Sequence, residues 1–168
     1  FVRADVEHWR SDRRFDEILA DTMRAVATTP DEAEAMRLLR RMKSETALLI
    51  ALADIGGVWP VMRVTAALTA LADTAVRGAV HFVLADAQRR GRFHALDPKH
   101  PERGSGYIVL AMGKMGAHEL NYSSDIDLIV FYDADVPVLP PGTEPAPFYV
   151  RLTRTLVKLL QERTVDGY

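Results

Sequence analysis

Residues 113–128, GKMGAHELNYSSDIDL, decide the fold, because they join two apolar segments with the composition of β-strands. The first segment is YIVLAM at residues 107–112, and the second is IDLIVFY at residues 126–132. Short runs rich in β-branched and aromatic residues, bounded by turn-forming residues, are typical of strands. The apolar residues around the two aspartates predict that the second strand is buried at the centre of a sheet. The sequence therefore predicts a strand, a polar loop and a second strand.

Asp125 and Asp127 are candidate metal ligands on the second strand. Side chains two residues apart on a strand leave the same face, so we expect the two carboxylates to share one face. Two carboxylates at the end of a buried strand are costly unless a cation meets them. Mg²⁺ takes carboxylate oxygens and leaves room for phosphate, and a pair of metal ions can hold both oxygens of a phosphoryl displacement. We therefore predict Asp125 and Asp127 as catalytic ligands of Mg²⁺, with Mn²⁺ as the alternative.

The loop before these aspartates has the features of a phosphate-binding site. Gly113 and Gly116 allow the backbone to approach a phosphate closely, and Lys114 adds a positive charge. The hydroxyl groups of Ser123 and Ser124 can cap the turn or bind a phosphate oxygen. Each feature alone is more often structural, but together they favour a nucleotide site that includes Gly113, Lys114, Gly116 and Ser124.

Three other motifs fit this stretch less well. Residues 111–116, AMGKMG, resemble a dinucleotide-binding fingerprint, but a parallel crossover needs about a dozen residues or more, and 117–124 are too few. The zinc motif H-E-x-x-H begins at His118 and fails at Tyr122. A Walker A loop is absent, since no glycine frame precedes a Lys-Ser or Lys-Thr pair.

The first 91 residues are predicted to form a helical bundle. Apolar residues recur at helical spacing over residues 6–28, and further helices are expected over residues 29–54 and 60–88. We interpret these helices as structural, and a docking surface for a partner is the alternative interpretation.

The second of these helices has predicted ends. Thr29 as N-cap, Pro30 at the first helical position and Glu32 form the pattern of a capping box. Gly56 and Gly57 are expected to stop the helix, because glycine adopts a left-handed cap easily. The run ALLIALA at residues 47–53 is apolar on nearly all sides and predicts burial.

Residues 92–106 are rich in proline and glycine and predict a boundary between two domains, 1–91 and 92–168. A second Pro-rich loop, 137–147, precedes an amphipathic helix. The positions of that helix expected to face inward are Phe148, Leu152, Leu156, Leu159 and Leu160.

The composition excludes several classes of protein. The chain has 168 residues, of which 48% are hydrophobic and 26% charged, with a net charge of −2 and no cysteine. These values exclude a disordered chain, disulfides and thiolate metal sites, and they give no electrostatic reason to bind nucleic acid or acidic membranes. The longest stretch without charge, 104–113, is shorter than a membrane span. We expect a soluble, cytoplasmic piece of a longer chain, with no nucleic acid or membrane as a partner.

The motif also carries a resemblance to a known family. GKMG at 113–116, Glu119-Leu120 and SDIDL at 124–128 resemble the signature of bacterial glutamine synthetase adenylyltransferases, within the DNA polymerase beta-like nucleotidyltransferase superfamily. SETALLIALAD at 44–54 resembles the segment before that signature, so the resemblance covers residues 35–168. It implies an α+β fold, in which an N-terminal helical bundle region precedes a truncated nucleotidyltransferase sheet.

The resemblance implies an enzyme that acts on glutamine synthetase, with a PII signalling protein as a second candidate partner. In that family one half removes AMP from a tyrosine by phosphorolysis and gives ADP, whereas the other half transfers AMP from ATP. The segment ELNYSSD at 119–125 is more similar to the sequence of the removing half, because the adding half tends to have glycine near position 123. The adding half and a non-catalytic regulatory docking fragment are the alternatives.

The resemblance also implies that a third metal-binding carboxylate lies beyond Tyr168, on a following strand. Asp166 is expected in the turn before that strand. Asp133 is roughly 20 Å from Asp127 by strand rise. We therefore predict that this fragment alone is inactive, with Asp125 and Asp127 as its two metal ligands.

Overall fold

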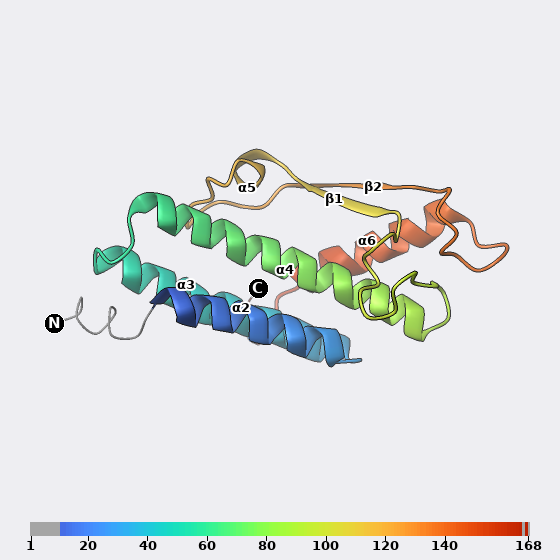
Figure 1. Ribbon diagram of the computed structural model, residues 1–168, viewed down its shortest axis with the longest axis horizontal. Coiled ribbons are helices and arrows are strands. Elements are labelled where there is room, and N and C mark those ends of the chain that lie inside the picture. The colour runs from blue at the N-terminus through green and yellow to red at the C-terminus, as the bar shows by residue number, and fades with distance from the viewer. Residues whose placement is uncertain (1–10, 166, 168) are drawn as a thin grey trace.

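The chain forms an α+β structure in which helices surround a long central helix and a small sheet lies on one side. The computed structural model describes residues 11–165 and 167. Figure 1 shows α2 and α3 on one side of α4, and the strands β1 and β2 with α5 on the other. The elements in chain order are α2 (Ser11–Thr28), α3 (Glu32–Ile55), α4 (Val61–Arg89), β1 (Tyr107–Ala111), α5 (Gly113–Gly116), β2 (Leu128–Tyr132) and α6 (Pro145–Gln161).

The three helices predicted in the first half are present. Residues 6–10 of the first predicted helix lie outside the described residues, and the helix runs on to Thr28 as expected. At the end of α3, the Gly57 N–H donates to the Asp54 carbonyl and the Val58 N–H to the Ala53 carbonyl, both at 2.9 Å. Gly57 has φ +67°, so a left-handed glycine ends the helix as predicted.

The predicted start of α3 is wrong by two residues. Its N-cap is Asp31, whose carboxylate accepts a hydrogen bond from the Ala33 N–H at 3.2 Å. The Thr29 hydroxyl instead accepts the Asp31 N–H at 3.2 Å, in the turn before the helix. The capping box at Thr29, Pro30 and Glu32 does not form, because the turn occupies the threonine side chain.

The prediction that residues 47–53 are buried on nearly all sides is also wrong. Leu49, Ile50 and Ala53 are buried, but Leu48 is 62% exposed and Leu52 is 39% exposed. The reason is that α3 packs through one stripe of its surface and leaves the opposite face uncovered by the described elements.

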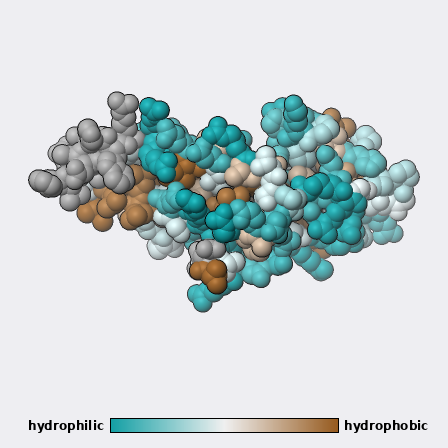
Figure 2. Space-filling view, turned by 90° about the horizontal axis from the view of Figure 1, so that it is seen from below, coloured by the Kyte–Doolittle hydropathy of each residue, from teal (hydrophilic) through white to brown (hydrophobic). Residues whose placement is uncertain are grey.

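Figure 2, which views the molecule from below, shows a largely hydrophilic surface with apolar side chains gathered near the end where α3 leads into α4. The exposed large apolar residues of that connection are Ile55, Val61 and Met62.

The sheet consists of two antiparallel strands with one exposed face. Tyr107 pairs with Tyr132 at one end, and Ala111 pairs with Leu128 at the other. The prediction of a strand buried at the centre of a sheet is wrong, because Ile129 is 42% exposed and Phe131 53% exposed. Only the face that carries Leu128 and Val130 packs against the helices.

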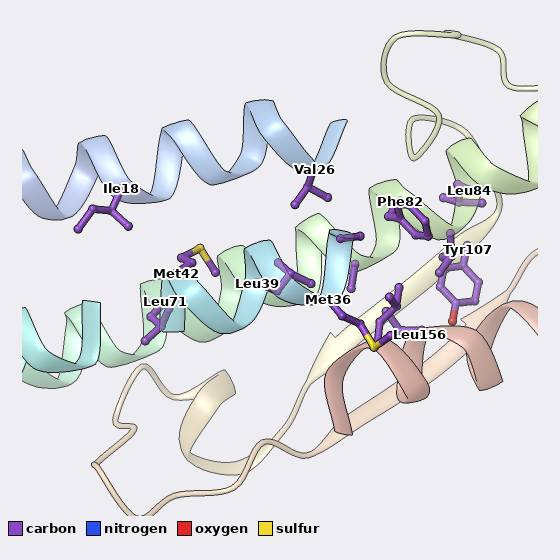
Figure 3. Close-up of a cluster of buried hydrophobic side chains, with 14 of the residues drawn as sticks. Ile18, Val26, Met36, Leu39, Met42, Leu71, Phe82, Leu84, Tyr107 and Leu156 are labelled. Atoms are coloured by element: carbon purple, nitrogen blue, oxygen red, sulfur yellow. The ribbon is translucent and has the colours of Figure 1, made fainter. Parts of the chain in front are cut away.

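One hydrophobic core connects the helices to the sheet. Figure 3 shows side chains from α2, α3, α4, β1 and α6 converging, among them Leu39, Phe82, Tyr107 and Leu156. This core continues across residue 91, and the division into domains 1–91 and 92–168 remains a prediction. The inward positions predicted for α6 are confirmed: Phe148, Leu152, Leu156 and Leu159 are buried, and Leu160 packs partly buried against them.

The central helix α4 is apolar as well as long. By length and composition alone it could cross a membrane, and 56% of its most apolar window is buried inside the protein. Burial of this kind is also found in the core helices of soluble proteins.

Candidate functional site

The candidate site is the loop that connects β1 to β2. The Met112 N–H donates to the Asp127 carbonyl at 2.9 Å, so the backbone pairing of the sheet continues one step beyond the strands. The chain between these two residues forms the single turn α5 and then a second turn that leads to Asp125. Because β1 and β2 are antiparallel, this loop is a hairpin connection and not the parallel crossover of a dinucleotide-binding fold.

The two aspartates share the outer side of this hairpin. Asp125 and Asp127 are exposed, whereas Ile126 and Leu128 are partly buried against the apolar cluster beneath the loop. This alternation places both carboxylates on the face that the helices do not cover. They lie just before β2 and not within it. Within the described chain no basic side chain forms an ion pair with either carboxylate, so both are available to a cation.

The two glycines of the loop have different surroundings. Gly113 has φ +54°, and a Cβ atom built on it would lie 3.8 Å from Oδ2 of Asp127. A Cβ atom on Gly116 would lie 2.5 Å from the Ala111 carbonyl oxygen, which no side chain tolerates. Gly116 is therefore required for the packing of α5 on β1, and Gly113 leaves open space beside the Asp127 carboxylate.

Asn121 organises the turn before the aspartates. Its Oδ1 accepts hydrogen bonds from the Ser124 hydroxyl at 2.8 Å, the Ser123 hydroxyl at 3.2 Å and the Ser123 N–H at 3.1 Å. The Asn121 N–H in turn donates to Oγ of Ser124 at 3.1 Å. The Ser124 hydroxyl is thus engaged within the turn, and a hydrogen bond from it to a phosphate would replace the one to Asn121.

Lys114 and Glu119 frame the first part of the loop. Lys114 is exposed and forms no ion pair with the residues that the structure describes. Its carbonyl accepts the Glu119 N–H at 2.8 Å, so backbone hydrogen bonding closes α5. The exposed ammonium group can meet an anion that approaches the loop.

Two apolar residues attach the loop to α4. Met115 and Leu120 are buried in a small cluster with Val76, separate from the main core. The position of the loop relative to the helices therefore depends on this cluster.

Tyr122 makes a second attachment, to α3. Its hydroxyl donates a hydrogen bond to Oδ2 of Asp54 at 3.1 Å. Burial, with the hydrogen bond to Asp54 and the charge of that carboxylate acting in the same direction, raises the pKa of Tyr122 to about 12. The sequence does not predict this contact, since no local pattern connects residues that lie 68 positions apart.

The described residues offer two carboxylates for a metal ion and no third. No group of three metal-ligating side chains occurs among residues 11–165 and 167. Asp133 lies just past the other end of β2 and accepts the Asp135 N–H at 3.0 Å. Asp166 lies outside the described residues. This donor set fits Mg²⁺, which is commonly held by one or two carboxylates, with water and phosphate oxygens completing its shell.

Comparison with known proteins identifies relatives of the whole chain. The family model described as "Glutamate-ammonia ligase adenylyltransferase" matches residues 4–168. A bifunctional glutamine synthetase adenylyltransferase/adenylyl-removing enzyme of Bradyrhizobium diazoefficiens is 59% identical over 90% of the chain. Proteins of the same name from Bradyrhizobium sp. ORS 278 and Xanthobacter autotrophicus are 60% and 56% identical over 90% and 86% of the chain. The matched part spans about 15% of the length of each of these relatives.

Proposed function

Because this chain belongs to the glutamate-ammonia ligase adenylyltransferase family, we propose that it carries the metal site of an enzyme half that removes AMP from glutamine synthetase. The observation that supports a metal site is the pair Asp125 and Asp127, exposed on one face beside Gly113. The choice of removal over addition rests on Ser123, where the adding half of similar proteins tends to have glycine. The reaction would take place in the cytoplasm.

The proposed reaction is a phosphorolysis. An oxygen of orthophosphate attacks the phosphorus of the adenylyl group, the bond from that phosphorus to the tyrosine oxygen breaks, and ADP and tyrosine are the products. Tyrosine has a pKa of about 10, so its oxygen leaves with little need for a general acid. The demand on the protein is therefore to hold and orient phosphate groups.

Asp125 and Asp127 would hold Mg²⁺, or Mn²⁺ in its place. The ion would neutralise the negative charge that develops on the phosphate oxygens during transfer. Both carboxylates are exposed on the outer face, which gives a nucleotide phosphate access to an ion bound there.

The phosphate side of the site would be formed by the loop. Gly113 keeps the space beside Asp127 free of a side chain, and the exposed Lys114 would contribute positive charge. Gly116 would act through the packing of α5 on β1, and Ser124 through the turn that Asn121 holds. Each of these residues would shape the nucleotide site without taking part in proton transfer.

The test uses the full-length protein that contains this chain, with adenylylated glutamine synthetase, Mg²⁺ and orthophosphate, and follows ADP release. We expect phosphate-dependent ADP release that falls at least about a hundredfold in Asp127→Ala, the size of effect seen when a transition-state contact is removed. Asp133→Ala, at the other end of the same strand, is the matched control and should retain activity.

Other outcomes assign a different function. Pyrophosphate released from ATP, with unmodified glutamine synthetase and no requirement for phosphate, would show the adding half. Binding to glutamine synthetase or to a PII protein that survives Asp125→Ala and Asp127→Ala, with no reaction and no metal requirement, would show a docking fragment. The 168-residue chain alone should be inactive under the same conditions, because its described residues bring no third carboxylate to Asp125 and Asp127.

A further inference from the structure

We propose that Tyr122 is a positioning residue, which uses its hydrogen bond to Asp54 to hold the segment that carries Asp125 and Asp127 against the helices. The proposal rests on the proposed function, since it concerns the same two carboxylates. The proposal gives Asp54 a role in the site, although Asp54 belongs to α3, which contributes none of the predicted metal ligands.

The contact joins two parts of the chain that no strand pairing connects. Asp54 lies in the last turn of α3, and its Oδ2 accepts the Tyr122 hydroxyl at 3.1 Å. Tyr122 lies three residues before Asp125, within the turn between α5 and β2. The hydrogen bond therefore ties the carboxylate-bearing loop to the end of a 24-residue helix.

Hydrogen bonds within the turn connect Tyr122 to the aspartate segment. Asn121 closes the turn with hydrogen bonds to Ser123 and Ser124, so Tyr122 sits inside a locally fixed unit. Asp125 follows that unit directly. Because a bonded turn moves as one body, a shift of Tyr122 would carry Asp125 with it.

Few other contacts hold this unit in place. Leu120, just before the turn, is buried against α4, and the Asp127 backbone pairs with Met112 after it. Between these points, the bond from Tyr122 to Asp54 is the one side-chain hydrogen bond from residues 121–126 to the helices, among the residues that the structure describes. Without it residues 121–125 would be held only by Leu120 before them and by Ile126 and the Asp127 backbone after them.

A purely structural role predicts something different from a positioning role. Tyr122 is 54% exposed, and a hydrogen bond at such a site contributes little to global stability. Loss of a positioning contact should instead change the geometry of the two carboxylates, and therefore the affinity for a metal ion, while the rest of the fold keeps its stability.

The experiment compares Tyr122→Phe, Asp54→Ala and the double variant in the full-length protein. Mn²⁺ is titrated with detection of the free ion, hydrogen exchange is followed at residues 121–127, and thermal stability is recorded. Asp54→Asn keeps an oxygen that can accept the tyrosine hydroxyl and serves as the conservative variant. Tyr132→Phe removes a hydroxyl that makes no hydrogen bond to the described residues, and serves as the matched control.

We expect Tyr122→Phe and Asp54→Ala each to weaken Mn²⁺ binding by about three- to tenfold, the range that corresponds to one lost hydrogen bond. The double variant should be no weaker than either single variant, and Asp54→Asn should recover most of the affinity. Exchange should quicken at residues 121–127 and stay unchanged in α2, whereas Tyr132→Phe should match the wild type.

Unchanged exchange at residues 121–127 in both single variants would overturn the proposal, because the contact would then hold nothing in place. A fall in thermal stability with Mn²⁺ affinity intact would overturn it as well, in favour of a purely structural contact. The proposed function fails separately: Asp127→Ala would then bind Mn²⁺ as the wild type does, while the exchange measurement still decides whether Tyr122 holds the loop.

Discussion

Asn121 shows how one side chain can define the approach to a pair of carboxylates. A single amide oxygen accepts three hydrogen bonds from the two serines that follow it, and this fixes the direction in which the chain enters Asp125. Asparagine is suited to this task because its side chain imitates a backbone carbonyl in a tight turn. The sequence predicted that Ser123 and Ser124 could cap the turn or bind a phosphate oxygen, and in the structure both hydroxyls bond to Asn121 within the turn.

Tyr122 should make the stability of the protein depend on pH in the alkaline range. Its pKa in the folded state is raised from 10.0 to about 12, first by burial and then by the hydrogen bond to Asp54. A group whose pKa is raised on folding contributes stability that is complete below the unfolded value and is lost as the pH rises through the folded value. This contribution should therefore disappear between about pH 10 and pH 12.

Urea unfolding of the wild type and of Tyr122→Phe, measured across that range, tests this expectation. The free energy of unfolding of the wild type should fall relative to that of Tyr122→Phe as the pH rises from about 10 to about 12, because other titrations cancel in the comparison. Two parallel curves would show that the tyrosine titrates alike in the folded and unfolded states.

At the scale of elements, the N-terminus of α3 gives a prediction that separates two adjacent candidates. Asp31→Ala should lower the free energy of unfolding by about 1 kcal/mol, because it removes the acceptor of the Ala33 N–H. Thr29→Ala should cost less, since the Thr29 hydroxyl bonds in the turn outside the helix. Denaturant unfolding of both variants measures the difference. A larger loss of free energy of unfolding in Thr29→Ala than in Asp31→Ala would show that Thr29 is the N-cap.

The elements also show what the sequence could predict and what it could not. Helical periodicity and glycine stop signals are local, so the ends of α4 and the stop at Gly57 were predictable. An apolar strand carries no information on whether both of its faces are covered, and this is why the exposure of Phe131 was missed. The motif predicted that Asp125 and Asp127 lie on one face. It could not predict the hydrogen bond from Tyr122 to Asp54, because that contact depends on tertiary packing and not on the local sequence.

At the scale of the molecule, Arg40 joins α3 to the end of α6. Its guanidinium donates to the carbonyls of Leu159 at 2.7 Å and Glu162 at 2.8 Å, which are acceptors that the helix end leaves free. Burial lowers the pKa of Arg40, partly offset by the Glu162 carboxylate. The charge is retained, because arginine stays protonated even when its pKa falls.

Arg40→Met should therefore destabilise the whole protein by about 1–3 kcal/mol, the cost of leaving the buried Leu159 carbonyl and the partly buried Glu162 carbonyl without this donor. Arg41→Met is the matched control, since the neighbouring Arg41 is exposed and pairs with Glu45, a surface ion pair worth about 0–1 kcal/mol. Thermal unfolding of both variants gives the comparison. Equal effects would mean that the bonds from Arg40 to α6 contribute no more than a surface pair.

The small cluster under the loop has a consequence for how this protein can change over time. Val76 is a residue of α4, yet it packs against Met115 and Leu120 of the loop that carries the aspartates. A larger or smaller side chain at position 76 would move that loop without touching any polar group. Helix α4 and the loop must therefore change together during evolution. A chimaera that takes one of them from a related protein will keep the loop in position only when it takes the other from that protein too.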